Sequence, residues 1–148
     1  MAKSFSLRIL LLSGYLTLLF VISPVISWAG KIEDAIEQVQ QRPNDVNSHI
    51  DLGRAYFSSG QYQNAINAYE QAIRINPDDY LPHYAIGASY GKMKRYRESI
   101  SPYMEARRIK PDFAYTHNDL GLIYSYLGQH EKAIISIKEA IRLKPNYE

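Results

Sequence analysis

The chain contains 148 residues, with 17 Lys and Arg against 15 Asp and Glu and no cysteine. This length allows one modest domain, and the small net charge argues against a protein that binds nucleic acid through its overall charge. The lack of cysteine excludes disulfide frameworks, thiol catalysis and cysteine-based zinc sites.

Residues 1–29 are organised like a targeting segment. Lys3 and Arg8 precede a long apolar run, and the small residues Ser27 and Ala29 stand three and one residues before a cleavage point. This layout is typical of a secretory signal peptide. We therefore expect the remainder of the chain to be exported, to the periplasm or to the extracellular side.

An uncleaved membrane anchor is the alternative for this segment. Residues 9–29 contain no charge and number 21, which is long enough to cross a hydrocarbon core of ~30 Å. Both alternatives keep the positively charged N-terminus inside and export the rest of the chain. Any membrane contact would run through residues 9–29.

Residues 30–45 predict one amphipathic helix followed by a stop. Apolar residues recur at helical spacing between Lys31 and Gln41, and Pro43 follows where a helix would end. We interpret this segment as a capping helix, the second half of a degenerate repeat.

One sequence cassette then occurs three times at an unbroken interval of 34 residues. A fixed period of this length predicts stacked supersecondary units, here residues 46–79, 80–113 and 114–148. The recurring residues are His49, Leu52, Gly53, Tyr56, Ala65, Tyr69, Ala72 and Pro77; then His83, Ile86, Gly87, Tyr90, Ser99, Tyr103, Ala106 and Pro111; and then His117, Leu120, Gly121, Tyr124, Ala133, Ile137, Ala140 and Pro145.

Each unit predicts a helix, a turn and a second helix, so the expected fold class is all-α. In the first unit the apolar spacing indicates helices over residues 46–59 and 62–75. Asp45 is the expected N-cap of the first helix, and Gly60 supplies the turn.

A glycine recurs in the middle of each first helix, where it costs about 1 kcal/mol relative to alanine. Three recurrences imply a compensating gain, and the expected gain is the close approach of the paired helix. The small residues expected to face Gly53, Gly87 and Gly121 are Ala65, Ser99 and Ala133.

The cassette as a whole resembles the tetratricopeptide repeat, over about 70% of the chain (residues 46–147). The resemblance implies a right-handed α-solenoid whose first helices line a concave groove for a peptide or helical ligand. By this resemblance the groove residues are Asn47, Ile50, Arg54, Phe57, Leu81, Tyr84, Ala88, Tyr115, Asn118, Leu122 and Tyr126.

Two departures from the family pattern concern packing. Histidine stands where the family often has tryptophan, and Arg107 replaces the isoleucine of the other two units, which predicts an opening or polar patch between units two and three.

A subclass of the family grips C-terminal carboxylates with basic residues in the groove. The matching positions here include Asp119 and only one basic residue, Arg54, so we do not expect that activity.

The histidines do not predict a metal site. Three of them are 34 residues apart and so lie on successive helices, which pack about 8–10 Å apart, whereas zinc–nitrogen bonds are about 2.0–2.1 Å. Nucleophile and phosphate-binding motifs are also missing from the sequence. We expect no catalytic residues, no metal and no cofactor.

A basic run in the second unit comprises Lys92, Lys94, Arg95 and Arg97. It predicts a docking spot for an acidic protein or for lipid headgroups, and the alternative is a solvated turn balanced by neighbouring acidic residues. Pro102 lies inside the second helix of the same unit and is expected to kink or loosen it.

The last helix has no polar helix after it in this sequence. Ile134, Ile137, Ile141 and Leu143 would be partly uncovered, although Lys138 could screen them. Solenoids need polar ends to stay soluble, so self-association or partner packing is expected there.

The sequence therefore predicts a non-catalytic adaptor that binds a protein or peptide in its groove and does not bind nucleic acid. The alternative is an assembly subunit that packs through its C-terminal helix.

Overall fold

The computed structural model describes residues 30–144, which are helical and contain no strand. The expected leader and the last four residues of the third unit lie outside the described residues. A first helical segment covers residues 30–41. The remaining helices are α2 (Val46–Ser58), α3 (Tyr62–Ile75), α4 (Tyr80–Lys92), α5 (Tyr96–Ile109), α6 (Ala114–Tyr126) and α7 (His130–Leu143).

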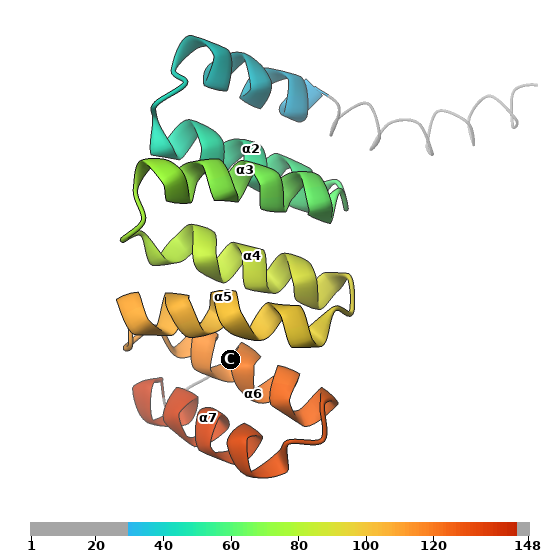
Figure 1. The fold of residues 1–148 in the computed structure, drawn as a ribbon, viewed down its shortest axis with the longest axis vertical. Helices are drawn as coiled ribbons and strands as arrows, with labels where there is room; N and C mark the ends of the chain where they lie inside the picture. Colours follow the sequence, from blue (N-terminus) through green and yellow to red (C-terminus); the bar gives the residue numbers. More distant parts are fainter. Residues whose placement is uncertain (1–29, 145–148) are drawn as a thin grey trace, which may run out of the picture.

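The helices form a one-dimensional stack in which each pairs with its sequence neighbours. α2 packs on α3, α4 on α5 and α6 on α7, and the pairs are joined by α3–α4 and α5–α6 contacts. The segment 30–41 and α7 lie at opposite ends of the stack (Figure 1). α4 also contacts α6 directly, so these first helices of successive units form one continuous wall. The described residues thus form an α-solenoid.

The N-cap expected at the start of α2 is confirmed. The Asp45 carboxylate accepts hydrogen bonds from the Ser48 backbone N–H at 2.9 Å and from the Ser48 hydroxyl at 2.7 Å. These bonds hold the pKa of Asp45 below its usual value, with the side-chain bond as the largest cause. Asp79 caps α4 through the Leu81 N–H at 2.9 Å. Phe113 holds the corresponding position before α6 and provides no side-chain cap.

The turn inside each unit needs a residue in the left-handed region. Gly60 and Gly128 fill this position with φ of 80° and 71°, as expected for glycine. The second unit has Lys94 there instead, with φ of 59°. One residue of the basic run is therefore held in a strained turn.

The expected close approach at the mid-helix glycines is confirmed. The expected facing residue is found only at Gly121, where a Cβ would lie 3.3 Å from the Ala133 backbone oxygen, and a larger side chain is the nearest neighbour of each glycine. A Cβ on Gly53 would overlap the Tyr69 ring, and a Cβ on Gly87 would lie 2.7 Å from the Tyr103 ring. At Gly121 the facing side chain is Ile137, at 2.5 Å.

In the first two units the expected residues, Ala65 and Ser99, are not the nearest neighbours, because they lie one helical turn before the facing ring on the partner helix. Ala65 and Ser99 are both 0% exposed, and they line the crossing without facing the glycine. The aromatic ring that follows each of them by four residues occupies the space a glycine leaves open.

Two apolar clusters result from this packing. The first contains Ile50, Ile66, Tyr69 and Ile86 and joins units one and two. The second contains Tyr103, Leu120, Ile123, Tyr124 and Ala133 and joins units two and three. Each unit therefore buries its apolar faces against the next, as the period predicts.

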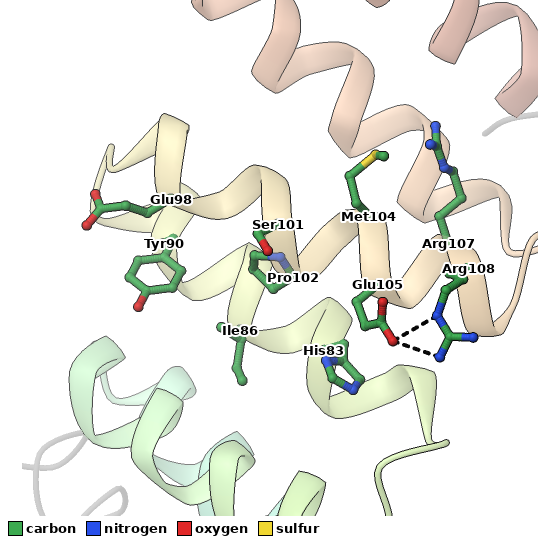
Figure 2. Close-up of a pocket in the computed structure, with 10 residues that line it drawn as sticks. All are labelled: His83, Ile86, Tyr90, Glu98, Ser101, Pro102, Met104, Glu105, Arg107 and Arg108. Atoms are coloured by element: carbon green, nitrogen blue, oxygen red, sulfur yellow. Dashed lines mark hydrogen bonds and ion pairs between the residues drawn. The ribbon is translucent and has the colours of Figure 1, made fainter.

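The helix α5 continues through Pro102 without a break (Figure 2). Proline has no N–H to donate to the carbonyl four residues earlier, but the expected loosening does not interrupt the helix.

Candidate functional site

A cavity of about 490 Å³ opens between α4 and α6, on the wall formed by the first helices. Ligand pockets commonly have this size. Its lining comes from α2, α4, α5 and α6: Phe57, Tyr84, Ala88, Gly91, Lys92, Tyr96, Tyr103, Asp119, Leu122, Ile123 and Tyr126. We call it the tyrosine cavity.

Five of the groove residues expected from the sequence line this cavity together: Phe57, Tyr84, Ala88, Leu122 and Tyr126. Leu122 is 46% exposed and Tyr126 is 66% exposed. They lie four residues apart on α6 and therefore share one helix face. The structure thus leaves an apolar and aromatic surface uncovered at the cavity.

The aromatic walls of the cavity are held by ring contacts. Tyr96 and Tyr126 stack with centroids 4.7 Å apart and planes 8° apart, and Tyr84 packs on Tyr103 at 5.6 Å. Neither Tyr96 nor Tyr103 is among the groove residues expected from the sequence. Their role in the cavity is set by the turn between α4 and α5, which brings the start of α5 beside the end of α6.

Asp119 is the polar centre of the cavity. The sequence marked it as a groove position only because it argues against a carboxylate grip, and did not include it among the expected ligand contacts. Its Oδ2 accepts hydrogen bonds from the Tyr84 hydroxyl at 2.8 Å and from the Tyr103 hydroxyl at 3.3 Å. Its Oδ1 accepts from the Asn118 side chain at 3.2 Å. Burial, and then the Asp119 charge, raise the pKa of Tyr103 above its usual value, so this hydroxyl remains a donor at neutral pH.

The other expected groove residues are divided among three places. Ile50 is 3% exposed and belongs to the first cluster; it is buried because units one and two meet there, so it cannot contact a ligand. Leu81 is half-buried against the same cluster. Tyr115 is 42% exposed, and its hydroxyl accepts a hydrogen bond from the Lys144 ammonium at 3.2 Å.

Asn47 and Arg54 lie on the exposed surface of α2, away from the tyrosine cavity. Arg54 pairs with Asp51 at 3.2 Å. Both residues of this pair line a shallower depression of about 420 Å³ beside the segment 30–41. The groove expected from the sequence is therefore not one continuous site.

A third depression, of about 910 Å³, lies on the outer face of the second unit (Figure 2). It is formed by His83, Ile86 and Tyr90 of α4 and by residues of α5. The side chains of these α4 residues point roughly opposite to the α4 side chains that line the tyrosine cavity, because successive residues of a helix are rotated by about 100° around its axis.

Arg107 lines this outer depression. The opening expected there from the sequence exists, but it lies within the second unit and not between units two and three. The difference arises because the depression is enclosed by α4 and α5 alone. Its other charges are largely satisfied, since Arg108 pairs with Glu105 at 2.8 Å (Figure 2).

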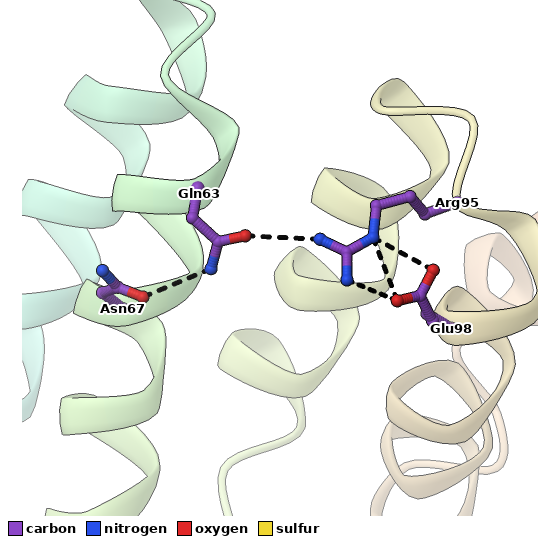
Figure 3. A network of polar contacts seen from close by, with 4 residues as sticks. All are labelled: Gln63, Asn67, Arg95 and Glu98. Carbon is purple, nitrogen blue, oxygen red and sulfur yellow. Dashed lines mark hydrogen bonds and ion pairs between the residues drawn. The ribbon is translucent and has the colours of Figure 1, made fainter.

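The basic run does not form one patch. Arg95 forms an ion pair with Glu98 and donates to Gln63 of α3 at 3.4 Å (Figure 3). Its guanidinium also lies 4.7 Å from the centre of the Tyr90 ring. Lys94 occupies the strained turn, whereas Lys92 lines the tyrosine cavity. Arg97 is exposed.

The cassette histidines have a shared structural contact. Nε2 of His49 lies 2.8 Å from the Pro43 carbonyl oxygen, and Nε2 of His117 lies 2.7 Å from the Pro111 carbonyl oxygen. His83 makes the equivalent contact at 3.3 Å. Each histidine thus ties a first helix to the loop before it. Residues 30–144 contain no cluster of His, Asp or Glu suited to hold a metal ion.

α7 has an uncovered apolar face. Ile134, Ile135 and Ile141 are 54%, 69% and 53% exposed. The equivalent of Ile134 in the first unit is Ile66, which is 1% exposed because the next unit covers it.

Within residues 30–144, none of the helices has the length and apolar character needed to cross a bilayer. The segment expected to be a leader or anchor is not among these residues.

The helix pairs stack into a right-handed α-solenoid, and its first helices leave one wall open. This architecture is typical of repeat proteins that act as interaction modules. Family profiles described as "TPR repeat" and "Tetratricopeptide repeat" match residues 53–94 and 114–147. The chain belongs to the tetratricopeptide-repeat family.

Solved structures agree with this fold. Residues of this chain superpose on a crystal structure of MamA with a TM-score of 0.76 at 23% identity, over 81% of this chain and 70% of that one. A second crystal structure of MamA protein gives a TM-score of 0.75 at 21% identity, over 91% of this chain and 74% of that one. These identities show a shared fold and nothing further. No curated protein matches the sequence.

Proposed function

We propose that this protein is a non-catalytic adaptor that binds a protein segment in the tyrosine cavity. The observation that carries the proposal is an uncovered aromatic and apolar surface, with Leu122 and Tyr126 46% and 66% exposed, at the mouth of a cavity of about 490 Å³. Exposed tyrosine beside apolar side chains is typical of sites that hold most of an interface's binding energy. The family is one of interaction modules, which agrees with this function.

A segment that enters the cavity would meet rigid walls. The ring contacts of Tyr96 with Tyr126 and of Tyr84 with Tyr103 hold the side chains in place before binding. Because these side chains are already ordered, they lose little conformational entropy on binding. More of the contact energy therefore contributes to affinity. The site therefore favours a peptide that inserts one or two side chains between α4 and α6.

A site-specific photo-crosslinker tests this proposal. We place it at Leu122 in the cavity and, as the control, at the exposed residue Glu70 of α3, which lines neither the tyrosine cavity nor the uncovered face of α7. A protein that is crosslinked from position 122, and is no longer crosslinked when Tyr126→Ala is added, supports the proposal. Crosslinking from position 70 alone, or crosslinking from position 122 that is indifferent to Tyr126→Ala, overturns it.

Assembly through α7 is a second candidate function. Ile134 and Ile141 are more than half exposed, whereas Ile66, the equivalent of Ile134 in the first unit, is buried under the following unit. The double substitution Ile134→Glu and Ile141→Glu is expected to give a lower sedimentation coefficient at high protein concentration if copies pack there. A coefficient equal to that of the wild type contradicts packing through this face of α7.

We also propose that the repeats are exported, either after removal of residues 1–29 or tethered by residues 9–29. The support is the sequence pattern of the leader. The mass of the protein isolated from its native cell distinguishes the two: a chain that begins at Gly30 indicates cleavage. A chain that begins at Met1 in the membrane fraction indicates an anchor, and one that begins at Met1 in the cytosolic fraction contradicts export.

A further inference from the structure

The tyrosine cavity combines a carboxylate with the rings of four tyrosines. Tyr84, Tyr96, Tyr103 and Tyr126 line it together with Asp119. The face of an aromatic ring carries partial negative charge and attracts cations. A carboxylate and several ring faces in one cavity therefore favour the same kind of guest, a positively charged group.

The charge of Asp119 is not neutralised within the described part of the chain. Its three hydrogen-bond donors are two tyrosine hydroxyls and the amide of Asn118, all neutral. None of the ion pairs among residues 30–144 includes Asp119. A carboxylate can accept about four hydrogen bonds, so it retains capacity for a charged donor.

The same position in the first unit is different. Asp51 is 68 residues earlier, two repeat lengths, and therefore occupies the equivalent place on α2. Its side chain is 53% exposed and pairs with Arg54 of its own helix. One carboxylate is thus satisfied locally, whereas Asp119 is fixed by tyrosines and left without a cation.

We infer that the tyrosine cavity binds a single lysine or arginine side chain of the partner segment, with the cation placed against Asp119 and the aromatic walls. This inference rests on the proposed function, because it states which type of side chain the tyrosine cavity selects in the bound segment. Charge-assisted hydrogen bonds to a carboxylate are about twice as strong as neutral ones, and a ring face adds to them when the cation is partly dehydrated.

Lys92 limits the number of charges in the guest. It lines the same cavity but stands eight residues from Tyr84 along α4, which corresponds to about 12 Å. A second cation at that end would meet the lysine ammonium. The preferred segment therefore has one basic residue, with neutral or acidic residues on the side that faces Lys92.

A bead-displayed library of acetylated, amidated decapeptides provides the test. The purified protein is panned as wild type, as Asp119→Asn and as the control Asp51→Asn, which removes the same charge from the equivalent position. The asparagine keeps one oxygen to accept from the tyrosine hydroxyls, and thermal unfolding of each variant checks the fold.

We expect the wild type and Asp51→Asn to enrich peptides with lysine or arginine at one fixed position, and Asp119→Asn to lose that preference. For the best peptide, anisotropy should show about a tenfold loss of affinity with Asp119→Asn. The same peptide with norleucine in place of the basic residue should bind equally to both proteins.

Tyr126→Ala is the second variant. It removes an exposed wall without touching the core and should weaken the basic peptide by about threefold.

Enriched peptides without a shared basic position, or a preference unchanged in Asp119→Asn, overturn the inference and leave the adaptor function standing. The absence of any enriched peptide overturns both.

Discussion

Gly87→Ala tests the tight crossing between α4 and α5. A Cβ on Gly87 would lie 2.7 Å from the Cδ1 and Cγ atoms of Tyr103, whereas carbon atoms in contact sit about 3.5–4.0 Å apart. The ring must therefore move by roughly 1 Å. Tyr103 is 3% exposed and donates to Asp119, so it has little room to move.

The expected cost is set by two opposing terms. Overpacking a buried site costs about 1–3 kcal/mol, and alanine gains about 1 kcal/mol over glycine in a helix interior. We expect a net loss of about 1 kcal/mol in the free energy of unfolding, or about 4 °C in Tm for a domain of this size.

Gly91→Ala is the matched control in the same helix. Its Cβ would meet only the Ile123 Cδ1 atom, at 3.9 Å, which is an ordinary contact. Because Gly91 lies in the last turn, it should gain about 0.5 kcal/mol from helix propensity. Urea unfolding followed by circular dichroism measures both variants. If Gly87→Ala is as stable as Gly91→Ala, the reasoning about the crossing is refuted.

Three further predictions concern a buried hydroxyl, a strained turn and a buried phenol. Thr116 is 0% exposed, and its hydroxyl has no hydrogen-bond partner among residues 30–144; Thr116→Val should raise the free energy of unfolding in urea by about 1 kcal/mol, and a decrease would contradict this. Lys94→Gly should stabilise the protein by about 1 kcal/mol in the same assay, because it removes a left-handed lysine, and a loss of stability would argue against strain. Burial raises the pKa of Tyr69 to about 12, so its contribution to stability is complete below pH ~10 and is lost as the pH rises through 12; Tyr69→Phe should flatten the fall of Tm between these pH values, and an equally steep fall would disprove the assignment.

The hydroxyl of Thr116 illustrates why local reasoning reaches only part of the structure. In the first unit, Asp45 caps α2 and accepts from Ser48, three residues later. In the third unit, Phe113 takes the cap position and leaves Thr116 without a partner. The ring of Phe113 packs on Tyr84 at 5.2 Å instead. A contact between units has replaced a cap within one unit.

The groove residues expected from the sequence also differ according to whether contacts between units affect them. Leu122 and Tyr126 were predictable from their place on the first helix of a repeat, and both are exposed. Ile50 holds a groove position by the same rule, yet it is buried where two units meet. The family pattern placed Asp119 in the groove, but its hydrogen bonds could not be predicted, because its tyrosine donors come from two other helices.

The sequence by itself determined the all-α class, the two helices of the first unit to within one residue, the turn at Gly60 and the family, because a 34-residue period records contacts that each unit repeats with its neighbour. Only the tertiary structure decided that Gly53 and Gly87 face tyrosine rings while Gly121 faces Ile137, that Lys92 of the basic run lines the tyrosine cavity, and that Asp119 lies among four tyrosines. The physical reason is that these features depend on which face of one helix contacts the next helix. That rotation is set by side-chain packing between helices and not by spacing along the chain.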